Sequence, residues 1–261
     1  MYKRQAHKFG VEFAIPDEAV RLECPGDAAC HTLTLANGET ARARAVVIAT
    51  GARYRRLPVE GTERFEGASL HYWASPLEAR LSAGEPVALV GGGNSAGQAA
   101  VFLAGYAGRV TILARRPLAQ TMSHYLIERI ASQPNIDVRE GAQVEALEGE
   151  GSALEAIRWG GKGEAEPHRL PARQLFLFIG ADPNTDWLAG TGVALDLGGF
   201  VVTGRDAGPD RLPLESSRAR VFAVGDVRSD SVKRVAAAAG DGALAVASIH
   251  ALFKRLEAEA D

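Results

Sequence analysis

Apolar residues in the middle of the chain follow a strand–turn–helix–strand pattern. Residues 87–90 form a short apolar run of the length expected for a buried parallel strand. Three glycines follow, and small and apolar residues then recur at helical spacing up to Leu103. A second apolar run, residues 110–113, lies at the distance needed for a crossover between parallel strands. The pattern therefore predicts a strand, a tight turn, a helix and a second, parallel strand.

Similar patterns predict further elements on both sides of this segment. Asn37-Gly38 lies between two apolar segments and favours a hairpin turn. A long helix is expected near the C-terminus, interrupted early by Gly240 and Gly242. Its apolar face would consist of Ile249, Leu252, Phe253 and Leu256. The other strands expected are residues 11–15, 31–35, 40–45, 45–49, 136–138, 144–147, 154–159, 174–179, 200–202 and 221–224.

Length and composition are those of a globular protein. The 261 residues are 46% hydrophobic and 23% charged, which allows one large or two medium domains. A formal net charge of −3 argues against a nucleic-acid surface. No apolar run is expected to span a membrane, because Gly240, Asp241 and Gly242 interrupt the alanine-rich stretch. The segment MYKRQAHKFG lacks the apolar core of a secretory signal. We therefore expect neither a nucleic acid nor a membrane as partner.

Cysteine and histidine usage predicts a reducing compartment and no metal site. The chain has two cysteines, Cys24 and Cys30, which could pair or stay free but form no disulfide framework. The expected location is therefore the cytoplasm. The six histidines are scattered without the spacing of metal ligands.

The glycines after the first strand match a dinucleotide-binding loop. Gly91, Gly93 and Ala96 give the pattern G-x-G-x-x-A. In this pattern the first glycine allows a tight turn, the second lets the backbone approach a pyrophosphate, and the small third residue lets helix and strand pack closely. The pyrophosphate would bind the free N–H groups at the helix N-terminus. The alternative is a tight strand–helix turn without a ligand.

The residues after the second strand favour NADPH over NADH. An NAD site carries an acidic residue about 20 residues after the glycines, to bind the ribose 2′-hydroxyl. No acidic residue lies between Pro86 and Ile127, whereas Arg115 and Arg116 stand at the expected strand tip. Guanidinium groups match the 2′-phosphate of NADPH. The alternative is that two surface arginines only cap the strand.

Six motifs in order along the chain resemble the low-molecular-weight thioredoxin reductase family. They are QAHKFGVEF, VVIATGA, VGGGNSA, the Arg115-Arg116 pair, FIGADPNT, and VFAVGDV followed by AAAAGDGALA. The resemblance implies an α/β fold of two Rossmann-like, three-layer dinucleotide-binding domains. An NAD(P)H-binding domain (residues 58–180) would be inserted in an incomplete FAD-binding domain (residues 1–57 and 181–261).

The resemblance also implies which residues bind the two cofactors. NADPH would contact Gly91, Gly92, Gly93, Asn94, Ser95, Ala96, Arg115, Arg116 and Gly180. FAD would contact Thr50, Gly51, Gly225, Asp226, Lys233, Arg234 and Val235. For Asp226, whose expected role is to accept a hydrogen bond from the flavin ribitol, the alternative is an N-cap or turn aspartate.

The chain departs from the family pattern in three places. The family opens with a strand and its own G-x-G-x-x-G loop for FAD, and this chain starts after that point. We therefore expect an N-terminally truncated fragment, a misplaced start or one part of a larger protein, with FAD binding compromised. The family's C-A-T-C pair is replaced in HYWASPLEA, residues 71–79, which has no cysteine to supply a thiolate. Gln120 stands where the family usually has another phosphate-binding arginine.

Two functions remain open at this point. The first is an oxidoreductase that passes hydride from NADPH to FAD and on to an unidentified acceptor other than a CxxC disulfide, with its catalytic residues unknown. Cys24 and Cys30 are interpreted as bystanders. The second is a non-catalytic NADP(H)-sensing regulatory module of a larger protein. The WASP sequence and VGGGNSAGQAAVFLA look similar to a reductase-like module found with cyclic-nucleotide-binding domains. The family resemblance also allows a homodimer.

Overall fold

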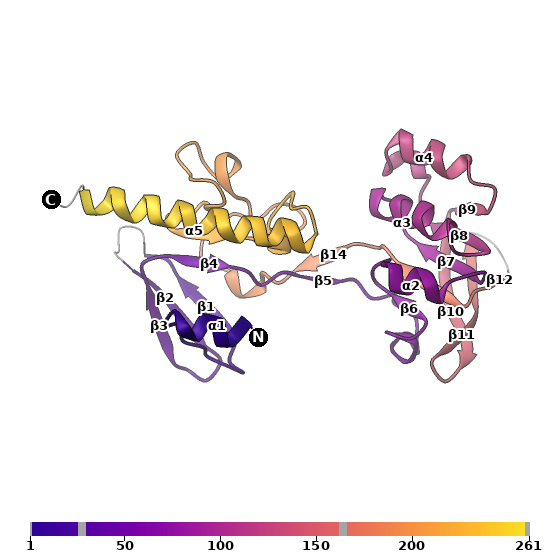
Figure 1. The fold of residues 1–261 in the computed structure, drawn as a ribbon, viewed down its shortest axis with the longest axis horizontal. Coiled ribbons are helices and arrows are strands. Elements are labelled where there is room, and N and C mark those ends of the chain that lie inside the picture. The colour runs from indigo at the N-terminus through magenta and orange to yellow at the C-terminus, as the bar shows by residue number, and fades with distance from the viewer. Residues whose placement is uncertain (1, 26–29, 162–165, 259–261) are drawn as a thin grey trace. The chain divides into compact units, whose positions relative to one another are not determined.

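The computed structural model describes residues 2–25, 30–161 and 166–258, and it divides the chain into two units (Figure 1). One unit, Tyr54–Gly180, is continuous in sequence and is called the inserted unit below. The other, called the split unit, consists of Met1–Arg53 and Ala181–Asp261. The assignment of one cofactor to each domain stays a proposal and is taken up below.

The inserted unit is built on a parallel sheet of five strands in the order β6-β13-β7-β8-β9. The chain leaves β7 for β8 and β9 on one side and returns to β13 on the other side. Such a reversal of strand order is a switch point, and ligands of open α/β sheets bind there, at the carboxyl ends of the strands. The strands are β6 (Leu70–His71), β7 (Pro86–Val90), β8 (Arg109–Ala114), β9 (Ile136–Glu140) and β13 (Gln174–Leu177).

Two different layers cover the faces of this sheet. Helix α3 packs with Leu89, Ile112 and Phe176 in one core cluster, to which α4 also contributes. Alternate strand residues such as Ala88 and Leu113 belong to a second cluster, shared with the antiparallel sheet β10-β11-β12. The predicted strand–turn–helix–strand segment is therefore confirmed. The covering elements are α2 (Pro76–Leu81), α3 (Asn94–Ala104), α4 (His124–Ala131), β10 (Ala142–Glu150), β11 (Ala153–Gly161) and β12 (His168–Pro171).

The split unit has less regular structure. Strands β4 and β15 form a two-stranded parallel sheet, and β1, β2 and β3 form an antiparallel meander. The predicted Asn37-Gly38 turn joins β2 to β3, with Gly38 at φ 88°. The remaining elements include a long C-terminal helix. Their bounds are α1 (Tyr2–Lys8), β1 (Ala19–Glu23), β2 (His31–Leu35), β3 (Thr40–Ala43), β4 (Val46–Ile48), β5 (Ala52–Tyr54), β14 (Ala181–Pro183), β15 (Val221–Ala223) and α5 (Val235–Ala258).

Helix α5 corrects the expectation of an early interruption. It runs unbroken through Gly240 and Gly242 over 24 residues. A glycine costs a helix about 1 kcal/mol relative to alanine, and the surrounding alanines tolerate that cost. The predicted apolar face is confirmed, with Leu252 buried and the other three residues packed beside it. By length and composition α5 could also cross a membrane, contrary to the sequence expectation, although such a helix alone is weak evidence for a span.

Three other expectations about local structure are wrong. Residues 11–15 form no strand, and Val11, Phe13 and Ile15 are 44%, 39% and 58% exposed. Alternating apolar residues need a partner strand, and β1 at Ala19–Glu23 pairs with β2 instead. Of residues 200–202 only Val201 forms isolated bridges. Helix α2 was not anticipated, because its six residues are too few to show periodicity.

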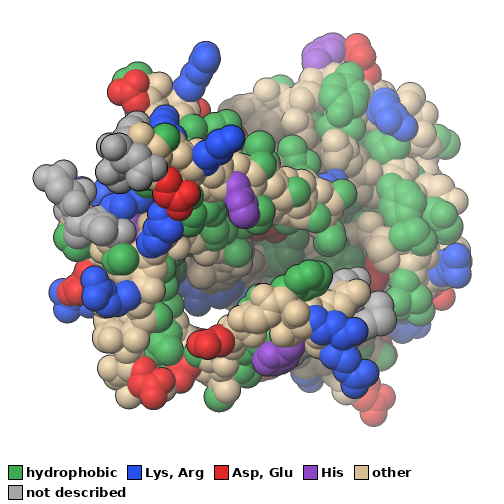
Figure 2. Space-filling view, turned by 60° about the vertical axis from the view of Figure 1, so that its left-hand side comes forward, with side chains coloured by type: hydrophobic (Ala, Val, Ile, Leu, Met, Phe, Trp, Pro, Cys, Tyr) green, Lys and Arg blue, Asp and Glu red, His purple; other side chains and the backbone are tan. Residues whose placement is uncertain are grey.

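Charged side chains are mixed on the visible surface. Figure 2 shows Lys and Arg interspersed with Asp and Glu on the face that it draws. That face therefore carries no broad basic area of the kind that binds nucleic acids.

His31, at the start of β2, is a buried polar residue without partners. It is 3% exposed, and among the described residues neither ring nitrogen has a hydrogen-bond partner. Burial and the nearby Arg220 guanidinium hold the pKa of the imidazole below its ordinary value. The Ala219 carbonyl, outside hydrogen-bonding geometry, offsets this only in part. The folded chain therefore keeps His31 neutral.

We predict that acid destabilises the split unit through His31. Below about pH 6.5 the unfolded chain binds a proton here that the folded chain does not, so the free energy of unfolding falls as the pH drops. His31→Leu should remove this part of the loss, as measured by urea unfolding at about pH 8 and about pH 5.5. His250→Leu, at an exposed histidine of the same unit, is the control. An unchanged difference between the two pH values in His31→Leu would contradict the prediction.

Candidate functional site

Gly91 forms the tight turn between β7 and α3, directly beside β13. Its φ is 150°, and an added Cβ atom would lie 2.5 Å from the Phe178 carbonyl oxygen. The Gly91 N–H also donates to the Leu113 carbonyl of β8 at 3.1 Å. A side chain at this position would therefore push apart the two strand ends that meet here.

The helix that follows begins without a side-chain cap. Gly93 is the N-cap of α3, and no side chain accepts a hydrogen bond from the first turn. Ala96 is fully buried against the sheet, as the G-x-G-x-x-A pattern predicts. The atom nearest to a Cβ added at Gly93 is the Thr121 carbonyl oxygen, 3.9 Å away, so the space above this turn is open. Uncapped N–H groups beside open space fit an anion such as a pyrophosphate.

A second segment packs beside the glycine loop. The Thr121 hydroxyl donates to the Gly92 carbonyl at 2.7 Å. The Ser123 N–H donates to the side-chain oxygen of Asn94, also at 2.7 Å. Both contacts join residues 29 positions apart, so no local pattern in the sequence could have predicted them. Ser95 is exposed beside Asn94 on the first turn of α3.

Arg115 and Arg116 lie at the carboxyl end of β8, where the sequence places them. Both are exposed, and neither forms a salt bridge with another residue in the described part of the chain. Gln120 ends the short 3-10 helix η2 (Leu118–Gln120) that follows. The arginines are therefore available to a phosphate at the same sheet edge as the glycine loop.

The structure adds an acidic residue to this edge that the sequence reasoning missed. Glu140 ends β9 and is the register partner of Ala114, the last residue of β8. Its Oε1 atom accepts a hydrogen bond from the Leu118 N–H at 2.7 Å. The sequence pattern places a ribose-binding acid after β8 alone. Glu140 reaches the same edge from the neighbouring strand.

Gly180 belongs to the same sheet edge but makes different contacts. It follows β13 with φ 99°, and its carbonyl accepts a hydrogen bond from the Arg55 N–H at 3.0 Å. Phe178, two residues earlier, is the residue of this segment that borders Gly91.

The residues that replace the family's cysteine pair form a helix cap. Ser75 is the N-cap of α2, and Glu78 completes a capping box. The Glu78 carboxylate accepts hydrogen bonds from the Ser75 N–H at 2.9 Å, the Ser75 hydroxyl and the Trp73 indole N–H at 3.2 Å. Burial opposes ionisation, but these hydrogen bonds outweigh it and hold the pKa of Glu78 below its ordinary value. The segment is thus a structural cap with no redox group.

In the split unit, the residues expected to border FAD are fixed by one asparagine. The Thr50 hydroxyl donates to the Asn184 carbonyl at 2.8 Å, and the Asn184 side-chain amide donates to the Thr50 carbonyl at 2.7 Å. The Asn184 N–H donates to the Gly51 carbonyl at 3.0 Å. The motifs VVIATGA and FIGADPNT therefore meet at the carboxyl end of β4.

The other residues expected at FAD lie between β15 and α5. The Gly225 N–H donates to Asp241 of α5 at 3.0 Å, and Asp241 also pairs with Arg228 at 3.3 Å. Asp226 follows the N-cap, Val224, of the 3-10 helix η5 (Gly225–Val227), so it does not cap that helix. Its half-buried carboxylate has no partner among the described residues and can accept a ligand hydroxyl. Before α5, the Lys233 ammonium lies 4.4 Å from the Phe200 ring centre, and Arg234 and Val235 are exposed.

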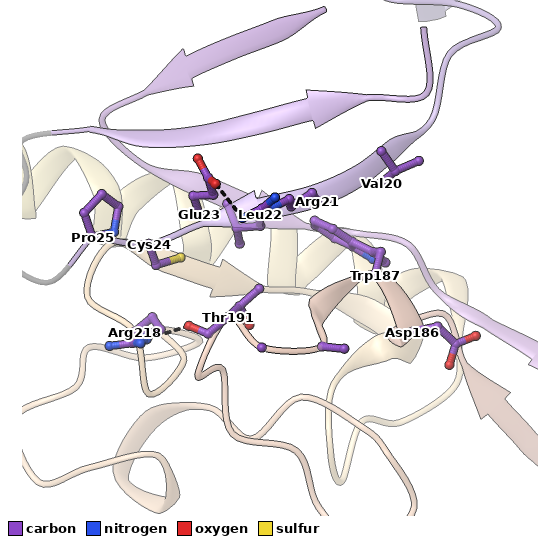
Figure 3. Close-up of a pocket in the computed structure, with 12 residues that line it drawn as sticks. Val20, Arg21, Leu22, Glu23, Cys24, Pro25, Asp186, Trp187, Thr191 and Arg218 are labelled. Carbon is purple, nitrogen blue, oxygen red and sulfur yellow. Dashed lines mark hydrogen bonds and ion pairs between the residues drawn. The ribbon is translucent and has the colours of Figure 1, made fainter. Parts of the chain in front are cut away.

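A separate cleft of about 710 Å³ lies in the split unit, between β1 and residues 186–191 (Figure 3). Its lining includes Cys24, Trp187, Thr191 and Arg218, and Arg218 donates to the Thr191 carbonyl at 2.8 Å. Burial raises the pKa of the Cys24 thiol, and the Arg218 charge offsets this only in part. Both Cys24 and Cys30 are free thiols. The glycine loop belongs to the other unit, so this cleft is not the predicted nucleotide site. No cluster of metal-ligating side chains occurs among the residues described.

The crowding at Gly91 and the open space at Gly93 predict opposite effects of the same substitution. Gly91→Ala should lower the free energy of unfolding of the inserted unit by about 1–3 kcal/mol, because its Cβ would overlap the Phe178 carbonyl. Gly93→Ala, at φ −91° with no close neighbour, is the matched control and should change it by less than about 0.5 kcal/mol. Urea unfolding curves measure both. Equal losses in the two variants would contradict this account of the turn.

Comparison with known proteins places the chain in a family. The family model described as pyridine nucleotide-disulphide oxidoreductase matches residues 5–242. The chain is 32% identical over 216 residues to an alkyl hydroperoxide reductase of Pseudomonas putida, an alignment that covers 82% of this chain and 39% of that protein. It is 29% identical over 259 residues to thioredoxin reductase of Listeria innocua, covering 98% of this chain and 77% of that protein. The crystal structure of T. acidophilum thioredoxin reductase superposes with a TM-score of 0.68 at 26% identity, over 96% of this chain and 78% of that one. These matches confirm the resemblance seen in the motifs and the expected α/β class. The chain belongs to the pyridine nucleotide-disulphide oxidoreductase family.

Proposed function

We propose that the protein is a flavoprotein oxidoreductase that takes hydride from NADPH and passes electrons through FAD to an acceptor other than a CxxC disulfide. The observation that carries this proposal is the glycine turn leading into an uncapped helix, with two unpaired arginines at the same sheet edge. The chain spans 39% of the length of the first curated relatives that it matches, so the activity of a whole protein is part of the proposal.

In the inserted unit, the chain's own residues would bind and orient the nucleotide. The N–H groups of Asn94, Ser95 and Ala96 in the first turn of α3 would bind the pyrophosphate, and Gly93 leaves room for it. Arg115 and Arg116 would bind the 2′-phosphate. The contacts of Thr121 with Gly92 hold the loop in place for this role.

In the split unit, the chain would position the flavin. When bound, FAD accepts the hydride and supplies the redox chemistry. Asp226 would accept a hydrogen bond from a ribitol hydroxyl, and the backbone at Thr50 and Gly51 would border the cofactor. Gly225 and the segment Lys233–Val235 would lie against it, where the positive end of the α5 dipole favours negative charge on the flavin.

The relatives favour this enzyme over a non-catalytic sensor. Their names are those of reductases and of an NADH dehydrogenase. The Ser75–Glu78 helix cap offers no thiol in the place of the family's disulfide. A quinone-type acceptor agrees with that substitution. The cytoplasmic location, the homodimer and the link to cyclic-nucleotide-binding domains stay predictions.

The nucleotide site is tested by its discrimination between NADPH and NADH. Arg115→Ala should weaken NADPH binding by about 1–3 kcal/mol, the range for a charge-assisted hydrogen bond, and should weaken NADH binding less. Titration calorimetry of both nucleotides measures this. Arg129→Ala, at an exposed arginine of α4, is the matched control, and Gly93→Val should abolish binding of both nucleotides without unfolding the unit. Equal affinities for NADPH and NADH in the unmutated protein would refute the assignment.

The proposed acceptor predicts no dithiol chemistry. The protein should not reduce thioredoxin with NADPH, because no cysteine occurs in residues 71–79. Activity with added FAD should appear instead with quinone or ferricyanide. The control is the Cys24→Ser, Cys30→Ser double variant. If the parent reduces thioredoxin and the double variant does not, the non-thiol proposal is wrong.

A further inference from the structure

Strands β8 and β9 end together at the edge that carries the candidate nucleotide site. Ala114, the last residue of β8, is the register partner of Glu140, the last residue of β9. Arg115 and Arg116 follow Ala114 directly. Because neighbouring strands lie about 4.8 Å apart, the backbone of Glu140 starts one strand spacing from the arginine tip.

A hydrogen bond turns the Glu140 side chain toward this tip. Its Oε1 atom accepts from the Leu118 N–H at 2.7 Å. Leu118 begins η2 right after Arg115, Arg116 and Pro117, and it is 3% exposed in the core cluster of α3. The turn that carries the arginines is therefore anchored on one side by the core and on the other side by a carboxylate.

Glu140 is not neutralised in this position. Within the described residues it forms no salt bridge with Arg115 or Arg116, and its Oε2 atom has no hydrogen-bond partner. A free carboxylate oxygen thus faces the region where the two arginines would meet a phosphate. Like charges at this separation repel each other, and the repulsion weakens with added salt.

We propose that Glu140 is a specificity-determining residue of the nucleotide site. The inference rests on the proposed function and deepens it. The carboxylate opposes the 2′-phosphate of NADPH and can accept a hydrogen bond from the ribose 2′-hydroxyl of NADH. It takes the part that NAD sites give to an acid at the end of the second strand of the unit, but it comes from the third strand. The site therefore prefers NADPH less strongly than two unopposed arginines would.

Glu140→Gln isolates the charge from the anchor. Glutamine keeps an oxygen that accepts from the Leu118 N–H, and it removes the negative charge. The ligands are 2′,5′-ADP and 5′-ADP, which differ in the 2′-phosphate and lack the nicotinamide, so the readout does not depend on FAD. Titration calorimetry should show the affinity ratio of 2′,5′-ADP to 5′-ADP rising about three- to tenfold in the variant at low salt, with a smaller rise at about 0.5 M salt. Glu155→Gln, at an exposed carboxylate on β11, is the matched control.

The outcomes separate this inference from the function on which it rests. If the unmutated protein binds both ligands and Glu140→Gln leaves their ratio unchanged or lowers it, the inference is wrong and the nucleotide site stands. If the unmutated protein binds neither ligand, the proposed function fails and the inference fails with it. A thermal unfolding curve of Glu140→Gln that matches the parent shows that the ratio reports on a folded site.

Discussion

The close crossing of the β7–α3 turn and the end of β13 is the constraint on which the inserted unit depends. At Gly91 an added Cβ would lie 2.5 Å from the Phe178 carbonyl oxygen, so the turn has no room for a side chain. Without this approach β13 could not sit beside β7, and the strand order that creates a switch point would be lost. The first glycine of the motif therefore serves the sheet before it serves any ligand.

The starts of helices α2 and α3 show how similar geometry serves different ends. Helix α2 satisfies its own first turn through Ser75 and Glu78, and it leaves nothing for a ligand. Helix α3 starts at Gly93 without a side-chain cap, and the space in front of it is open. Unsatisfied N–H groups cost stability unless water or an anion pairs with them. This contrast supports a nucleotide at α3 and a purely structural role for the segment that stands in the place of the family's cysteines.

Charge at the sheet edge is divided between two strands. Arg115 and Arg116 come from β8, and Glu140 comes from β9. Because the strands are parallel and end together, groups of opposite sign reach the same place without being neighbours in sequence. In the split unit the same principle joins Thr50 to Asn184 and Gly225 to Asp241, each pair linking distant segments by hydrogen bonds.

The sequence by itself determined the strand–turn–helix–strand segment, the Asn37-Gly38 hairpin, the apolar face of α5 and the family, because each depends on local spacing or on motifs in order. It was wrong about residues 11–15 and about a break at Gly240, since a strand needs a partner and a helix can absorb a glycine. Only the tertiary structure decided that Phe178 borders Gly91, that Thr121 holds Gly92 and that Glu140 lies beside the arginine tip. The physical reason is that periodicity encodes which face of an element is buried, whereas strand order and register decide which distant side chains meet.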